Sequence, residues 1–116
     1  MYQLQLHKTL TQEKWSLFST DRQLLMIANE INRLSNGLRA GQPLSELRSC
    51  IERAFELFDL TIGIQRASLQ RELLRLRDFF AELYVADETQ LQRALSSIET
   101  AYRALLFMHP ASALLV

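Results

Sequence analysis

The feature that most constrains this chain is an apolar repeat at helical spacing with very little punctuation. The 116 residues include only three glycines and two prolines, the residues that most often separate one element from the next. Between these breaks, apolar side chains recur at intervals of three and four, which is the period of a helix with one buried face. The sequence therefore predicts an all-α protein.

Four such segments, each bounded by a cap or a breaker, predict the main helices: residues 19–37, 43–63, 67–85 and 87–110. Asn36-Gly37 is expected to end the first segment with a left-handed residue, and Gly63 to stop the second. The fourth segment opens on Asp87-Glu88-Thr89-Gln90, a capping-box pattern, and Pro110 prevents it from continuing further. Ahead of them, Trp15 to Phe18 predicts a short leading turn.

The connections indicate how the helices are arranged. The break near Gly63 is short, which favours an antiparallel hairpin, although one long bent helix is the alternative. The leading turn is either a kinked start of the first helix or a separate helix. We expect residues 1–116 to form a single domain, an up-and-down bundle of four main helices with a short leading helical segment.

Composition bounds the possible partners. Thirteen basic residues balance thirteen acidic ones, so no net field draws the chain to nucleic acid or to an anionic bilayer. Cys50 is the only cysteine and the start lacks the pattern of a secretory signal, which predicts a reducing cytoplasm. The aliphatic runs are too short to span a membrane. We therefore expect a cytoplasmic protein for which nucleic-acid binding is unlikely and membrane insertion is excluded.

Residues that could carry chemistry are few. Neither His7 nor His109 has a histidine or cysteine one turn away, so the sequence predicts no metal and no other cofactor. Several arginines lie in the third segment or directly before it, which raises the hypothesis of phosphate binding: Arg66, Arg71, Arg75 and Arg77. At about 100° per residue these arginines fall on different faces, which favours a solvated helix surface.

One motif resembles a known family. Residues 103–109, Arg-Ala-Leu-Leu-Phe-Met-His, are similar to the arginine-to-histidine element of HEPN-type helical domains, some of which cut RNA. The resemblance implies that Arg103 and His109 form a ribonuclease pair. Ala104 departs from the polar residue that usually follows the arginine in those domains.

Apolar residues outside the core stripes predict a second buried face. Five of them are candidates for a protein interface: Leu25, Met26, Leu57, Leu60 and Phe79. Residues 111–116, Ala-Ser-Ala-Leu-Leu-Val, are also apolar and dock either on the bundle or on a partner. The alternative is a larger core, over which Trp15 to Phe18 folds as a fifth helical segment.

The sequence favours a non-catalytic cytoplasmic protein that acts through protein–protein interaction, as an adaptor or in a chaperone-like role, and associates as a homodimer. Its expected layout, a short leading helix and four packed ones, is similar to that of small secretion chaperones such as the flagellar export chaperones. The alternative function is a HEPN-like nuclease or nucleic-acid-binding module that uses Arg103 and His109.

Overall fold

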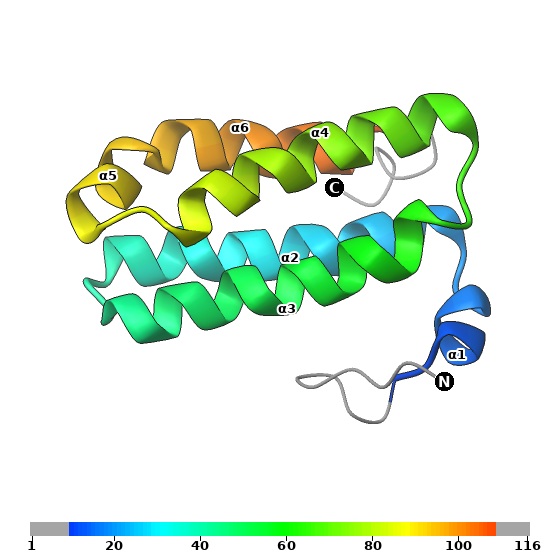
Figure 1. Cartoon of the computed structure of the whole chain (residues 1–116), viewed down its shortest axis with the longest axis horizontal. Helices are drawn as coiled ribbons and strands as arrows, with labels where there is room; N and C mark the ends of the chain where they lie inside the picture. The colour runs from blue at the N-terminus through cyan, green and yellow to red at the C-terminus, as the bar shows by residue number, and fades with distance from the viewer. Residues whose placement is uncertain (1–9, 109–116) are drawn as a thin grey trace.

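The structure is a computed structural model and describes residues 10–108. The part of the chain that it describes forms helices and no strands (Figure 1): α1 Gln12–Ser16, α2 Thr20–Arg39, α3 Leu44–Ile62, α4 Ala67–Tyr84, α5 Glu88–Arg93 and α6 Leu95–Leu106. The predicted all-α fold is confirmed.

The four long helices α2, α3, α4 and α6 form an up-and-down bundle in two layers. Figure 1 shows α2 beside α3 in one layer and α4 beside α6 in the other. The closely packed pairs are α2 with α3, α2 with α6, and α3 with α4. The core lies between the layers, and its largest fully buried side chains include Trp15, Phe58 and Phe80.

The leading segment is a helix of its own. Thr11 caps α1 by accepting a hydrogen bond from the Lys14 amide at 3.2 Å, and Ser19 caps α2 by accepting one from the Arg22 amide at 3.3 Å. Two separate caps mean two separate helix starts, so the first helix is split rather than kinked.

The end of α2 differs from the prediction. The helix continues through Gly37 to Arg39, and the left-handed residue of the connection is Gly41, with a φ of 69°. Gly37 has a different role, because a Cβ there would lie 2.6 Å from Gln42 Oε1, where the connecting loop returns over the helix. The glycine at position 37 therefore permits a close approach and does not end the helix.

The capping box at Asp87 is confirmed, but the helix after it is not continuous. The Gln90 amide donates to Asp87 Oδ1 at 2.8 Å, and the Asp87 amide donates to Gln90 Oε1 at 2.9 Å. At Ala94 the amide is shared between the carbonyls of Gln90 and Leu91, both at 3.1 Å. This tightened turn ends α5 and starts α6, so the prediction of one uninterrupted helix over 87–110 is wrong.

Candidate functional site

One hollow lies between α2 and α3 and is polar. It has a volume of about 580 Å³, and its lining includes Arg33, Cys50 and Arg53. The carboxylate of Glu30, which is 7% exposed, accepts hydrogen bonds from Arg53 Nε at 3.2 Å and Arg33 Nη1 at 3.4 Å. Burial raises the pKa of the Cys50 thiol, which keeps the sulfur neutral beside Arg53. Glu30 is thus paired with both arginines, which indicates that these charged side chains hold α2 against α3.

The Glu30–Arg53 ion pair beside this hollow makes a testable contribution to stability. We expect Arg53→Met to lower the free energy of unfolding by about 2 kcal/mol, because it leaves the Glu30 carboxylate largely buried with one arginine fewer. Arg33→Met is the matched control: the Arg33 side chain is 64% exposed, and we expect its loss to cost about 0.5 kcal/mol or less. Urea unfolding followed by circular dichroism measures both. Equal losses for the two variants would contradict the assignment.

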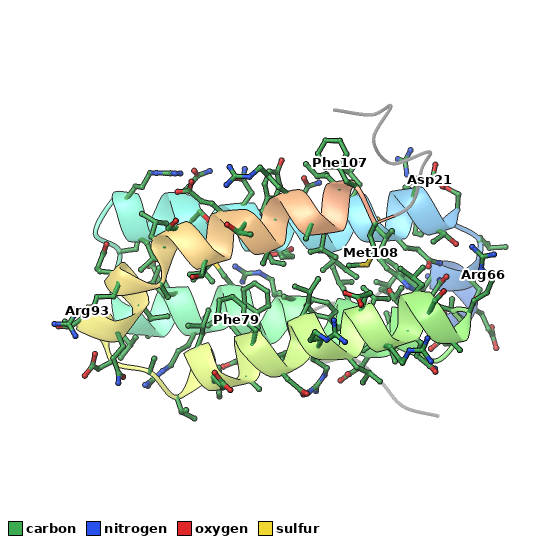
Figure 2. All side chains as sticks on the ribbon, turned by 90° about the horizontal axis from the view of Figure 1, so that it is seen from above. Asp21, Arg66, Phe79, Arg93, Phe107 and Met108 are labelled. Carbon is green, nitrogen blue, oxygen red and sulfur yellow. The ribbon has the colours of Figure 1, made fainter. Side chains whose placement is uncertain are left out.

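A second hollow, the α4–α6 groove, lies between the two helices of the other layer. It has a volume of about 300 Å³ and is lined by two large side chains of α4 and four small ones of α6: Leu76, Phe79, Ser97, Thr100, Ala101 and Ala104. In Figure 2 the two helices lie apart, and Phe79 projects between them. None of the lining residues carries a charge, so the groove is a candidate surface for an apolar ligand or partner.

The α4 wall of the groove is anchored on the core. Phe79 meets Phe80 edge-on with their ring centroids 5.1 Å apart, and Phe80 is fully buried against Phe58. The opposite flank of α4 faces α3, where Arg77 forms a two-point hydrogen-bonded pair with Asp59, with donor–acceptor distances of 2.7 and 3.3 Å. This contact orients α4 about its axis, so Phe79 is left on the side toward α6.

The α6 wall is small and uncharged. Its four lining residues recur at intervals of three and four, so they form one face of the helix. The Thr100 hydroxyl donates to the carbonyl of Ser96 on its own helix at 3.0 Å, so this polar group is already satisfied. Glu99 is directed away, toward α2, where it pairs with Arg39. Side chains this short cannot fill the space up to α4, which is why the groove stays open.

The described residues include no group of three or more His, Cys, Asp or Glu that could hold a metal ion. Within the same range, no helix is both long enough and apolar enough to cross a bilayer. The comparisons with family models, curated proteins and solved structures found no match for this chain.

Three of the five predicted interface residues keep some exposed surface. Phe79 lines the α4–α6 groove and is partly buried. Leu25 and Met26 lie on α2 and are partly buried against the core. The structure does not bring them to the groove, and an interface at Leu25 and Met26 stays a prediction.

The other two, Leu57 and Leu60, are not on the surface. They are 2% and 5% exposed and belong to the core. The expectation that they turn away from it is wrong, because α3 is covered by α2, by α4 and also by α1. Gln12 of α1 donates to the carbonyl of Leu60 at 2.9 Å, which places the short helix over this part of α3. Where α1 covers α3, the structure therefore has the larger core with a fifth helical segment that the sequence offered as the alternative.

The residues of the nuclease and phosphate-binding hypotheses are not gathered at one place in the described part of the chain. Arg103 is exposed on α6, and His109 lies outside the described residues. On α4, Arg77 pairs with Asp59 of α3, and Arg75 pairs with Glu72 on its own helix at 3.1 Å. Arg103 with His109 as a ribonuclease pair stays a prediction.

Sequence reasoning missed the α6 half of the groove. Alanine, serine and threonine are ordinary residues on a helix surface, and their common face on α6 did not stand out beside the leucine stripes. The available signal was the spacing of Ser97, Thr100, Ala101 and Ala104, which is as regular as that of a core stripe. Small side chains at that spacing indicate a helix face that leaves space for a ligand or a partner.

Proposed function

We propose that this chain is a non-catalytic protein-interaction domain that associates with a second copy of itself through the α4–α6 groove. The observation that carries the proposal is the open side of the bundle. Three neighbouring helix pairs are closely packed, whereas α4 and α6 are separated by an uncharged hollow of about 300 Å³. An exposed apolar hollow without charged residues is a feature typical of a docking surface.

The chemistry of the walls supports a helical occupant. Ala101 and Ala104 allow a backbone to approach α6 closely, and Phe79 and Leu76 offer a larger apolar surface on the other side. In a two-fold dimer the same surface of each copy faces the other, so the α4 wall of one copy can cover the α6 wall of its partner. Each groove then gains the side chains that its own α6 lacks.

The single cysteine supports a cytoplasmic location. Cys50 is a free, buried cysteine, and an unpaired thiol fits a reducing compartment. We therefore propose a cytoplasmic protein with an adaptor or chaperone-like role, in which the groove is the surface that meets other chains.

A charge in the groove tests this function. Ala104 is exposed and lies within α6, where glutamate is nearly as good a helix former as alanine, so Ala104→Glu preserves the fold. We expect it to raise the dissociation constant of self-association about tenfold or more, because the carboxylate would have to be desolvated in the interface. Sedimentation velocity over a range of protein concentrations measures the change.

The matched control places the same charge outside the groove. Leu74 is 44% exposed on α4 and does not line the groove, so Leu74→Glu should leave self-association unchanged. Circular dichroism checks that both variants stay folded. Equal weakening by the two substitutions would refute the groove as the interface, and a monomeric wild-type chain at every concentration tested would refute self-association.

A further inference from the structure

The α4–α6 groove has a candidate occupant within the chain. We propose that residues 111–116 of the same chain dock in this groove, so that each copy covers its own apolar hollow when no partner is bound. The inference rests on where the described chain stops, on how far the following residues reach, and on their chemistry.

The described chain stops beside the groove. α6 ends at Leu106, and the Met108 amide still donates to the carbonyl of Leu105 at 3.4 Å, so the backbone follows the helix to that point. Figure 2 shows Met108 on the side of α6 that faces α4, and Phe79 points toward α6 from the opposite wall. Met108 is also one helical turn beyond Ala104, which lines the groove.

The next residues favour a reversal of direction. Pro110 cannot continue a helix and is a preferred second residue of a β-turn. A turn over residues 109–112 would send the chain back along α6. From Ser112 to Val116 an extended chain spans about 13 Å, and α6 from Met108 back to Thr100 spans about 12 Å. After such a turn the chain is therefore long enough for residues 114–116 to reach the level of Ala104 to Thr100.

The chemistry of the two surfaces agrees. Leu114, Leu115 and Val116 are aliphatic, and residues 110–116 carry no charged side chain. The groove is likewise uncharged, and its alanines leave space where a branched aliphatic side chain fits. A segment tethered by so few residues has an effective concentration in the millimolar range, which favours its own groove over that of a second copy.

Docking of residues 111–116 has a consequence for association. The segment and a second copy would compete for one surface, so the chain limits its own self-association. This consequence rests on the proposed function, whereas the docking itself does not.

Cross-linking in the full-length chain tests the docking. In a Cys50→Ala background, Ala104→Cys and Leu115→Cys are introduced together and treated with a short bis-maleimide, and peptide mass spectrometry identifies the products. We expect a cross-link within the monomer that forms about tenfold faster than in the control pair. The control combines Leu115→Cys with Ser45→Cys, an exposed position at the start of α3. Circular dichroism checks that each variant keeps the helical fold.

Two outcomes would overturn the inference. Equal rates for the two pairs would mean that the segment is not held at the groove. Cross-linked dimers in place of the intrachain product would mean that it enters the groove of a second copy.

A second measurement separates this inference from the proposed function. Leu114→Glu combined with Leu115→Glu should release the groove and strengthen self-association about tenfold in sedimentation velocity. No change in self-association would contradict the competition. Conversely, an intrachain cross-link in a chain that stays monomeric would support the docking and refute the proposed function.

Discussion

Replacing Trp15 by alanine is expected to lower the free energy of unfolding by about 4 kcal/mol. The Trp15 side chain is 0% exposed, and its indole nitrogen donates to the Thr61 hydroxyl at 2.9 Å. Its ring also contacts Phe18 edge-on, with the centroids 5.8 Å apart. Removing it would leave a cavity between α1 and α3 and detach the short helix, because five residues do not form a stable helix alone. Urea unfolding followed by circular dichroism measures the loss.

Trp15→Phe separates the hydrogen bond from the packing. Phenylalanine keeps most of the apolar contact but leaves the Thr61 hydroxyl without its donor, although that hydroxyl still donates to the carbonyl of Leu57 at 2.7 Å. We expect a loss of about 1–2 kcal/mol. If Trp15→Ala stayed within about 1 kcal/mol of the wild type, the docking of α1 on the bundle would be wrong.

The second large effect is expected at Phe80, where alanine should cost about 4 kcal/mol. The Phe80 side chain is fully buried and lies between Phe58 and Phe79, with centroid distances of 6.2 and 5.1 Å. It joins α4 to α3 and supports the α4 wall of the groove from behind. The measurement is the midpoint and slope of urea unfolding, and weaker self-association should accompany the lost stability.

Phe79→Ala is the matched control, with the same chemical change one residue earlier. Phe79 is only partly buried and lines the groove, so we expect it to cost about 1–2 kcal/mol, less than half the effect at Phe80. Its effect on self-association should nevertheless be at least as large. A larger stability loss at Phe79 than at Phe80 would mean that the two rings are assigned to the wrong sides of α4.

The groove was only half predictable from the sequence. Phe79 stood out because it is apolar and lies beside the α4 core stripe, and the structure places it in the groove. Leu57 and Leu60 stood out for the same reason on α3, yet both are buried. The difference lies in the number of neighbours: α3 is covered by α1, α2 and α4, whereas the flank of α4 at Phe79 has only small residues opposite it. The apolar pattern of one helix does not predict which residues of the neighbouring helix lie opposite it.

The sequence by itself determined the helical fold and most helix boundaries, but not the end of α2 or the break between α5 and α6. The apolar period, the capping box at Asp87 and the stop at Gly63 all act within a few residues, so they can be read from the chain. Only the tertiary structure decided which apolar residues form the core and which are left over. That depends on contacts between distant segments, such as Trp15 with Thr61, and on the small side chains that keep α6 from filling the space beside α4.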